Sequence, residues 1–530
     1  MGLKIGSKTA VLPVVLVIIL LLPLTIASGA GNPLVFQTTW GAGDRNTAYG
    51  LGTDASGNVY VAGTANLNLP PDYIGAQGTI FLLKYDPHGN LAWQRSWNGS
   101  STGDRELGGV LAVDAQGDSF VAATSPVSRQ DACEGVYTLP GILLLKFDTS
   151  GNLVWQKTFA GSCRLAPYGI ALSRTGNIFL TALSWEQIDN SHNRSGSPFL
   201  IKLNPDGNVL WARTIEWGCI CGPGGVAVDG SENVVMNGDL IAKFDSEGSL
   251  IWEENLFVGL PTKTVSTYLS GTAVAFDNSG NIYTTGNGEI VKLASSGSVV
   301  WAKQWGNNSY GAGLEVDGSN NILLSGEIRP HTGAIPNWPN PFLIKLDPNG
   351  LLLGQTVWEG TSASNNYGSG FLALDAHGHA YVSGAVSGKP PFNSHYDVPT
   401  MYNVTAYAGA CNNTGCGLFP NLPASSQCAC NLWSYPVAPG NITSGNPNGT
   451  SKTLQGQSNS GGQNDIFLLG YDATQLGLAP NYIVPELVIG GTSVGAAIAA
   501  TTLFVLKRRR RRTQQSRIQP VEPLKSALPA

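Results

Sequence analysis

Two stretches decide the fold: Tyr49-Gly-Leu-Gly-Thr-Asp-Ala-Ser-Gly-Asn-Val-Tyr-Val-Ala-Gly63, and Phe81-Leu-Leu-Lys-Tyr-Asp-Pro-His-Gly-Asn-Leu-Ala-Trp93. Each contains two runs rich in apolar residues, joined by a short segment that begins with Asp and ends with Gly-Asn. The Asp side chain can hydrogen-bond its own turn and Gly accepts a positive φ angle, so each stretch predicts a β-hairpin. The pair together predicts a unit of four antiparallel strands.

This unit recurs along most of the chain. The residue that opens the first turn of each copy is an Asp in six copies and a Ser in one: Asp54, Asp114, Ser173, Asp229, Asp277, Asp317 and Asp375. The second hairpin also recurs, usually with a Trp in its last strand, at 144–155, 200–211, 240–252, 290–301 and 343–353. A unit of this size cannot bury a core alone, so its copies must pack against one another. Four strands in each of seven units predict an all-β, seven-bladed β-propeller.

The ends of the repeat predict how the ring closes. The seventh unit has a third strand at 465–472 but no convincing fourth strand after it. Leu34-Val-Phe-Gln-Thr-Thr-Trp-Gly41 matches the fourth strand Leu91-Ala-Trp-Gln-Arg-Ser-Trp97 in spacing and residue type. We therefore expect an N-terminal strand to complete the last blade and remove an exposed sheet edge.

The units resemble the SBBP-type β-propeller repeat of bacterial and archaeal surface proteins and, more loosely, NHL repeats. Pro223-Gly-Gly-Val-Ala-Val-Asp229 is similar to the first strand of an NHL repeat. The resemblance covers about 34–472 apart from the insertions. It implies seven blades whose Gly-led strand is innermost and a role as a binding scaffold, and it carries over no catalytic residue.

Two apolar segments lie outside the repeats. Residues 1–30 have the form of a signal peptide, with Lys4 and Lys8 before an apolar run and small residues at its end; an uncleaved anchor is the alternative. Residues 487–506 carry no charge and are followed by the basic run 507–512, which predicts a transmembrane helix with its basic flank in the cytoplasm. The predicted organisation is a signal peptide, a propeller over 31–475, a linker over 476–486, the membrane span and a cytoplasmic tail over 507–530.

The charge distribution agrees with an external propeller. Residues 31–485 contain 20 basic and 33 acidic residues, a net charge near −13, which argues against a nucleic-acid partner. The basic run at 507–512 could also suggest nucleic acid, but beside an apolar segment it is more simply a membrane anchor. We expect a single-pass cell-membrane protein whose N-terminal ectodomain lies outside.

The connections predict two unlike faces. Hairpin turns within each unit are short and fall on one face, here called the turn face. The connections from second to third strands and between units fall on the opposite loop face and include every long segment: roughly 64–79, 98–107, 124–140, 182–197, 254–270, 327–340 and 385–464. Long connections in compact domains are usually functional or disordered. The insertion 385–464 is therefore either a disulfide-pinned decoration or a lid over the central channel.

All eight cysteines fall in loop-face connections. An even number in an exported chain favours disulfides, and the Cys-x2-Cys spacing typical of zinc ligands does not occur. We predict a disulfide between Cys133 and Cys163 and internal disulfides within the insertion, and Cys219 and Cys221 have no assigned partner. The insertion cysteines are Cys411, Cys416, Cys428 and Cys430.

The N-x-S/T sequons, like the cysteines, all lie in predicted loop-face connections. They are Asn98, Asn193, Asn307, Asn403, Asn412, Asn441 and Asn448. Loops rich in Asn generate sequons by chance, so these are candidate glycosylation sites.

The sequence offers no strong catalytic constellation. The recurring Asp-x-x-Gly segments resemble fragments of calcium loops, but the full Asp-x-Asp-x-Asp-Gly pattern does not occur, and turn stabilisation explains them better. The six His residues form no cluster, and we predict no catalytic residue, metal site or cofactor. The recurring Trp residues predict packing between blades. Tyr49 and Tyr168 could ring the channel mouth, although tyrosines that simply pack the axis are the commoner case.

The function expected from these observations is non-enzymatic: adhesion, scaffolding, or capture of an extracellular protein or polysaccharide on the loop face. The alternatives are an extracellular enzyme acting on glycans and, less favoured, a quinoprotein-like oxidoreductase. The latter class resembles this chain in its Asp-x-x-Gly-Asn-Leu-x-Trp segments but usually has eight blades.

Overall fold

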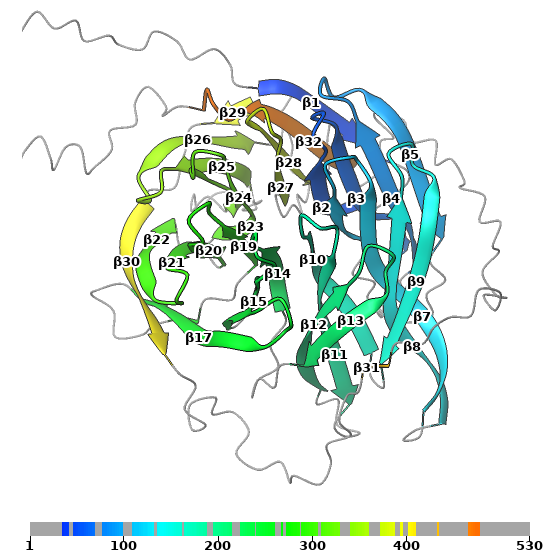
Figure 1. Cartoon of the computed structure of the whole chain (residues 1–530). Coiled ribbons are helices and arrows are strands. Elements are labelled where there is room, and N and C mark those ends of the chain that lie inside the picture. The colour runs from blue at the N-terminus through cyan, green and yellow to red at the C-terminus, as the bar shows by residue number, and fades with distance from the viewer. Residues whose placement is uncertain are drawn as a thin grey trace, which may run out of the picture. The chain divides into compact units, whose positions relative to one another are not determined.

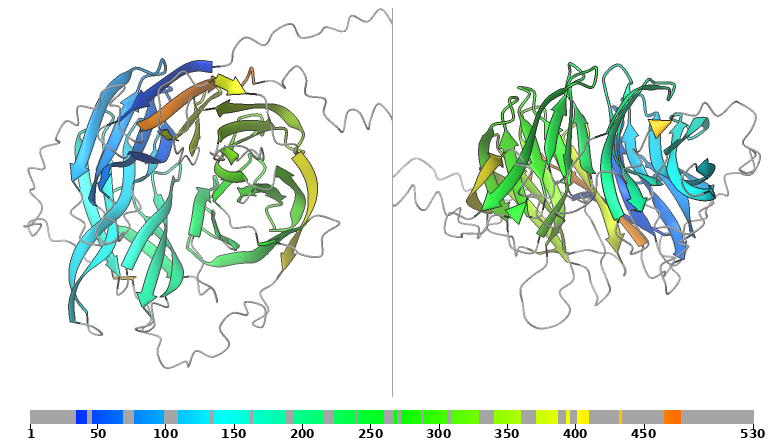
Figure 2. Two further views of the ribbon diagram at one scale, coloured as in Figure 1. Left: turned by 180° about the vertical axis from the view of Figure 1, so that it is seen from behind. Right: turned by 90° about the horizontal axis from the view of Figure 1, so that it is seen from below.

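The structure of the chain is a computed structural model. It describes residues 34–41, 46–68, 77–98, 109–131, 135–161, 164–187, 194–214, 223–238, 240–259, 267–268, 272–286, 288–305, 309–328, 340–359, 371–386, 393–395, 401–409, 432–433 and 465–476. The chain divides into two units, Met1–Gly477 and Leu478–Ala530, and every described residue belongs to the first. That unit is a closed ring of four-stranded blades (Figure 1; Figure 2 shows it from behind and from below).

Seven blades follow one another around the ring, and each has its strands in sequence order from the axis outward, except the last. Blade 1 consists of β2 (Thr47–Thr53), β3 (Val59–Asn68), β4 (Gln77–Tyr85) and β5 (Leu91–Asn98); blade 2 of β6 (Val110–Val113), β7 (Ser119–Asp131), β8 (Gly135–Phe147) and β9 (Leu153–Gly161); and blade 3 of β10 (Arg164–Leu172), β11 (Ile178–Gln187), β12 (Arg194–Leu203) and β13 (Val209–Thr214). Blade 4 consists of β14 (Pro223–Val228), β15 (Val234–Gly238), β16 (Ile241–Phe244) and β17 (Leu250–Gly259), and blade 5 of β19 (Ala273–Phe276), β20 (Ile282–Thr285), β21 (Glu289–Leu293) and β22 (Val299–Trp305). Blade 6 consists of β23 (Ser309–Val316), β24 (Ile322–Ile328), β25 (Asn340–Leu346) and β26 (Leu352–Glu359), and blade 7 of β27 (Phe371–Leu374), β28 (His379–Val386), β32 (Asp465–Asp472) and β1 (Leu34–Trp40). The predicted all-β, seven-bladed propeller is confirmed.

The Asp at the start of each first turn holds that turn closed. Asp54 Oδ1 accepts hydrogen bonds from the backbone N–H groups of Ser56 and Asn58, both at 3.0 Å. Its Oδ2 accepts from the Asn58 side chain at 2.7 Å and from the Tyr60 hydroxyl at 3.1 Å. The carboxylate is therefore occupied within its own hairpin, which agrees with the turn interpretation rather than with calcium binding.

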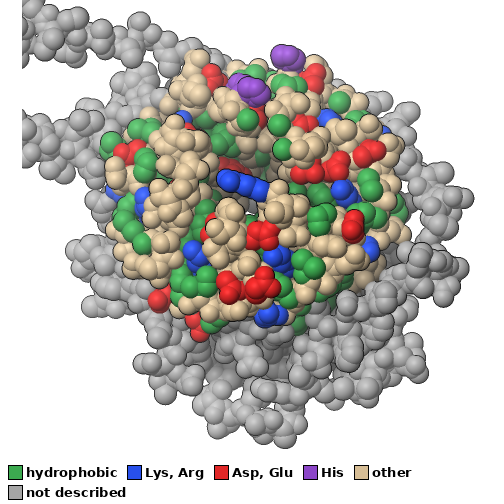
Figure 3. All heavy atoms as spheres, in the orientation of Figure 1, with side chains coloured by type: hydrophobic (Ala, Val, Ile, Leu, Met, Phe, Trp, Pro, Cys, Tyr) green, Lys and Arg blue, Asp and Glu red, His purple; other side chains and the backbone are tan. Residues whose placement is uncertain are grey.

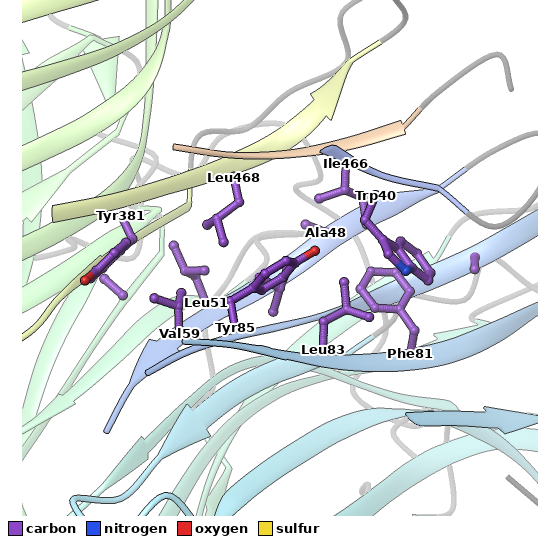
Figure 4. Packing of buried hydrophobic residues seen from close by; sticks show 13 residues of the cluster. Trp40, Ala48, Leu51, Val59, Phe81, Leu83, Tyr85, Tyr381, Ile466 and Leu468 are labelled. Atoms are coloured by element: carbon purple, nitrogen blue, oxygen red, sulfur yellow. The ribbon is translucent and has the colours of Figure 1, made fainter. Parts of the chain in front are cut away.

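The N-terminal strand closes the ring as predicted. β1 pairs antiparallel with β32, with Trp40 opposite Ile466 and Leu34 opposite Tyr471. Trp40 is buried against Phe81 of blade 1, with ring centroids 4.7 Å apart, and its Nε1 donates to Gln94 Oε1 at 3.0 Å (Figure 4). Both ends of the described chain thus share one blade, and that blade packs on the first.

The Trp residues of the outer strands join neighbouring blades, as the sequence indicated. Trp211 donates from Nε1 to the carbonyl of Ser246 at 3.0 Å and covers Gly248, whose added Cβ would lie 2.9 Å from the indole. Phe36 of β1 takes the same place against Gly89, so the docking continues through the closure. Blade 7 has no Gly at the corresponding turn, which reads Asp472-Ala-Thr-Gln475, and the preceding blade has Leu353 in place of Trp.

The described parts of the insertion lie on the outer edges of the ring rather than over its axis. β29 (Asn393–His395) pairs with β26 of blade 6, and β31 (Leu432–Trp433) pairs with β9 of blade 2. β30 (Met401–Gly409) pairs with both β22 and β17, and so joins blades 5 and 4 into one sheet. These segments add strands to exposed edges, which satisfies backbone groups that would otherwise be unpaired.

One predicted loop is largely strand. β7 and β8 stay paired from Ser119 opposite Phe147 to Asp131 opposite Gly135, so most of the connection at 124–140 is an extended hairpin. Among the described residues no helix is long and apolar enough to span a bilayer. The predicted signal peptide and the predicted span at 487–506 lie outside those residues and stay predictions.

Candidate functional site

The axis of the propeller is lined by the first strand of every blade. β2, β6, β10, β14, β19, β23 and β27 each lie at the end of their sheet and are hydrogen-bonded to one neighbouring strand only. The other edge of each carries backbone N–H and C=O groups directed away from its own sheet, toward the axis. The turn face is hollowed at its centre in the space-filling view (Figure 3).

The inner strands approach one another closely because their residues are small. A Cβ added to Gly50 would lie 2.5 Å from the Cβ of Leu111, and one added to Gly313 would lie 2.4 Å from the Cβ of Leu372. Both separations are shorter than carbon atoms tolerate, so a larger residue at either position would force the blades apart.

Two residues before the turn Asp or Ser, one inner strand differs from the rest. Blade 6 has Glu315 at this position, whereas the other blades have only Gly or Ala: Gly52, Ala112, Ala171, Ala227, Ala275 and Ala373. The Cβ direction at Gly52 meets Val113 of the next inner strand at 2.8 Å. By this repeated geometry the Glu315 side chain begins between the inner strands of blades 6 and 7.

Glu315 is the one acidic side chain at this position of the seven inner strands. Burial alone raises its pKa from 4.5 to about 7, and no charged neighbour contributes to that shift. Its side chain retains partial exposure, and none of the described residues forms a hydrogen bond or ion pair with it. Glu315 departs from the repeat at this position, but it belongs to no cluster of functional groups in the sequence.

The two tyrosines proposed for the channel mouth occupy equivalent places on inner strands. The register of β2 shifts between Ala48 and Gly50, and that of β10 shifts between Pro167 and Gly169, so Tyr49 and Tyr168 are the extra residues of two β-bulges. Burial raises the pKa of both hydroxyls, and at Tyr49 a hydrogen bond with Thr47 partly opposes it. Their role at a channel mouth stays a prediction.

On the turn face, lysines from the third strands lie beside the turn carboxylates. Lys345 Nζ is 3.3 Å from Asp317 Oδ2, and Lys146 Nζ is 3.0 Å from Asp118 Oδ2. Lys84 and Lys292 also donate to backbone carbonyls of the next blade. These cations are therefore engaged in joining turns rather than available to a ligand.

Blade 3, whose turn begins with Ser173 instead of Asp, receives a carboxylate from its neighbour. Glu232 of blade 4 occupies the turn position that is Gly in most blades and has a φ of 61°. Its carboxylate accepts from Lys202 at 2.7 Å, from Thr175, and from Asn177 at 3.0 Å. Sequence reasoning recognised the Ser but not the residue that compensates for it.

The histidines of blade 7 also surround a turn carboxylate. His379 Nδ1 lies 2.9 Å from Asp375 Oδ2, and His377 Nδ1 lies 3.8 Å from the same oxygen. Partial burial opposes ionisation of Asp375, but hydrogen bonds from His379 and Tyr381 lower its pKa overall. Within the described part of the chain, no group of three His, Cys, Asp or Glu side chains is placed to hold a metal ion.

Most of the other predicted site residues lie outside the described residues. This holds for Cys133, Cys163, Cys219, Cys221, Cys411, Cys416, Cys428 and Cys430, and for Asn193, Asn307, Asn412, Asn441 and Asn448. Of the remaining sequons, Asn98 ends β5 opposite Thr79, and Asn403 lies in β30 opposite Lys303. Disulfides and glycosylation at these residues stay predictions.

The comparisons with known proteins give no support to any particular function. No family model matches the chain, and no curated protein matches it. Among solved structures, a Dyadobacter fermentans protein of unknown function is 11% identical, with 71% of this chain and 99% of that chain covered and a TM-score of 0.39. YCF48 bound to a D1 peptide is 11% identical (67% and 93% covered, TM-score 0.37). A gluconolactonase from Xanthomonas campestris is 15% identical (55% and 84% covered, TM-score 0.30). At these scores the assignment of the propeller rests on its own strand order.

Proposed function

We propose that this chain is a membrane-anchored cell-surface protein that binds an extracellular protein or polysaccharide, or acts as an envelope scaffold, through its loop face. The observation that carries the proposal is that the connections on the two faces differ in length. The first and third connections of the blades are short turns closed by their own side chains, as at Asp54 and Asp86. The long connections all leave from the opposite end of the strands.

A rigid ring with one variable face is suited to recognition, because segments that differ in length and chemistry are held at fixed spacing. The loop-face connections of blades 3 and 6, 188–193 and 329–339, start from strand pairs whose register is regular up to the last described pair. The apolar segments at the two ends of the sequence support export and anchoring.

The first test is whether the propeller is outside the cell. Protease added to intact cells should remove it while leaving a cytoplasmic marker uncleaved. Protection of the propeller in intact cells, with cleavage after lysis, would contradict the proposal.

The second test is a glycan-array and cell-envelope binding screen with the full chain in detergent. Deleting the whole insertion is a poor variant, because it would also expose the outer edges of β17 and β22. A sharper variant replaces residues 185–196 by Asn-Gly, joining Ser184 to Ser197, which the register already pairs. A second replaces 329–339 in the same way, between Ile328 and Asn340.

The matched controls are His88→Ala and Gln116→Ala, since both residues are exposed in turns of the opposite face. Binding that weakens at least about tenfold in a loop-face variant and is kept in both controls would support the proposal. Binding that depends only on the turn-face residues, or no binding by the wild-type chain to any envelope component, would count against it.

A further inference from the structure

The outer strand of every blade contains the same irregularity where it leaves the turn face. In blade 3, Lys202 pairs with Trp211. Leu203 pairs with Val209, so Leu210 is the extra residue of a β-bulge. The same shift of register occurs in the other six blades, and the extra residues around the ring are Val35, Ala92, Val154, Leu210, Ile251, Val300 and Leu353. The bulge is therefore part of the repeat.

The bulge residue points into solvent, and in six blades it is a large aliphatic residue. Val154, Leu210 and Val300 are 53%, 53% and 54% exposed. The exposed large apolar side chains of the described residues all lie at a bulge residue or at most two positions before one. We call this set the apolar rim: Val35, Leu91, Leu153, Val154, Leu210, Leu250, Ile251, Val300, Leu351 and Leu353. Apolar side chains are visible at intervals around the ring on the turn face (Figure 3).

Packing within the blades does not explain the rim. Blade 1 has Ala92 at the bulge, so the strand forms without a large side chain there. Single exposed apolar residues are ordinary, but a set gathered at one end of the outer strands of a ring marks a surface that meets another apolar medium. Charges of the turn face are paired nearby, as in Lys345 with Asp317 at 3.3 Å. The contact is therefore apolar rather than ionic.

The two ends of the described chain lie at this same face. Leu34, which precedes a bulge residue, is opposite Tyr471 at the end of β32. The backbone N–H of Ala473 donates to a carbonyl in the first turn of blade 7 at 3.0 Å. Ten residues, 477–486, then precede the predicted membrane span at 487–506. Ten residues extend at most about 35 Å, so an anchored chain is tethered by its turn face. This favours lipid as the medium that the rim meets.

We propose that the apolar rim rests on the bilayer surface, with the bulge side chains in its interfacial region. The inference rests on the membrane anchoring of the proposed function and adds an orientation to it: turn face toward lipid, loop face outward. In five blades a half-buried Trp directly follows the bulge residue, and Trp is a residue type enriched at membrane interfaces. These residues are Trp93, Trp155, Trp211, Trp252 and Trp301.

Tryptophan fluorescence can report this contact, because neither 1–30 nor 487–506 contains Trp. The full chain is reconstituted into phosphatidylcholine vesicles, with or without lipid brominated near the headgroup end of its acyl chains, which quenches nearby Trp. Flotation verifies incorporation, and thermal unfolding verifies that each variant is folded.

The test variant is the triple substitution Val154→Ala, Leu210→Ala and Ile251→Ala, which copies blade 1 at three bulges. A second variant, Leu210→Glu with Val300→Glu, places charges on the rim without changing buried residues. The matched control is Gln116→Ala with Ser231→Ala, because both residues are exposed in first turns of the same face.

We expect brominated lipid to quench the wild type and the control equally. Quenching should fall at least about twofold in the triple Ala variant and further in the Glu variant, since interfacial binding scales with buried apolar area. A chain that floats with the vesicles but is not quenched would overturn the docking of the rim and leave the anchoring intact. A chain that does not float would overturn both.

Two further outcomes would also contradict the proposal. Equal quenching in all variants would place the lipid contact on another surface. A dimer in detergent that the rim variants dissociate, together with no quenching in vesicles, would assign the rim to a second copy of this chain instead of lipid.

Discussion

Lys202 Nζ lies 2.7 Å from Oε2 of Glu232, across the junction between blades 3 and 4. In most blades the third-strand lysine lies beside an acid of its own blade, as Lys345 does with Asp317. Here the acid comes from the next blade, because the blade 3 turn begins with Ser173. The repeat has therefore exchanged a local ion pair for one that ties two blades together.

Replacement of Glu232 by Gly should destabilise the ring even though Gly suits the positive φ angle better. The loss of charge-assisted hydrogen bonds to Lys202 and Thr175 is worth about 2 kcal/mol of unfolding free energy. Adding Ser173→Asp to Glu232→Gly rebuilds the turn pattern of the sister blades and should restore most of the loss. Denaturant unfolding of the two single variants and the double variant measures the coupling; additive effects would contradict this account.

Glu232 also makes the stability of the ring depend on pH in the acidic range. Partial burial opposes ionisation of Glu232, but hydrogen bonds from Lys202, Thr175, Ser173 and Asn177 outweigh it and lower its pKa to about 2. A depressed pKa means that the stabilisation is complete above about pH 4.5 and is lost as the pH falls toward 2. The difference in unfolding free energy between wild type and Glu232→Gln should therefore shrink over that interval.

Glu289 is expected to have the opposite pH dependence. It is 4% exposed, and burial raises its pKa to about 7 although Gln304 donates to Oε1 at 3.2 Å. Its Oε2 has no hydrogen-bond partner among the described residues. Because the folded state holds the proton more tightly, stability should decline as the pH rises from about 4.5 to 7.

Glu289→Gln should remove that decline and be more stable than the wild type above pH 7, by about 1–3 kcal/mol. The exposed Glu253→Gln serves as a control and should leave the profile unchanged. Equal pH profiles for wild type and Glu289→Gln would show that the carboxyl is not protonated in the folded chain.

Two glycines allow the energetic cost of disturbing a Trp contact to be distinguished from the cost of backbone strain. Gly248 and Gly280 have φ angles of 77° and 78°, but an added Cβ meets Trp211 at 2.9 Å in the first case and only Ser295, at 3.9 Å, in the second. Gly280→Ala should cost about 1–2 kcal/mol for the left-handed backbone alone. Gly248→Ala should lower the free energy of unfolding by about 1–3 kcal/mol more than Gly280→Ala does, because its Cβ would also overpack against Trp211. Similar unfolding free energies for the two variants would argue that the Trp contact is loose.

Ring closure is testable at Trp40. Trp40→Ala should destabilise the propeller by about 3–5 kcal/mol, because it removes a buried indole that packs on Phe81. Trp40→Phe should lose less, since it keeps a ring and gives up the hydrogen bond to Gln94. A cost below about 1 kcal/mol for the Ala variant would mean that β1 contributes little to closure.

The sequence predicted those features that recur in every blade. Strand order, the Asp turns, the Trp docking and the closing strand 34–40 follow from period-two patterns and from turn residues at fixed offsets. The pairing of β30 with β17 and β22 could not be predicted, because it joins segments about 100–150 residues apart through edges that exist only after the ring has formed.

The same limit applies to single residues. Ser173 and Glu232 belong to different positions of different repeats, so neither suggests the other until their turns lie side by side. Glu315 is different, because comparing the repeats at one position isolates it without any structure. Its raised pKa depends on burial, which emerges only from packing.

Both ends of the propeller contribute strands to the last blade, so that blade cannot form until most of the chain has been synthesised. β1, which begins at Leu34, cannot find its partner until β32, Asp465–Asp472, has been made. At synthesis rates of about 5–20 residues per second, that interval is roughly 20–90 s. During this time β1 has no partner strand to join, so the last blade cannot be completed before β32 has been made. Truncation anywhere before Asp465 would release a chain whose first strand remains available for aggregation.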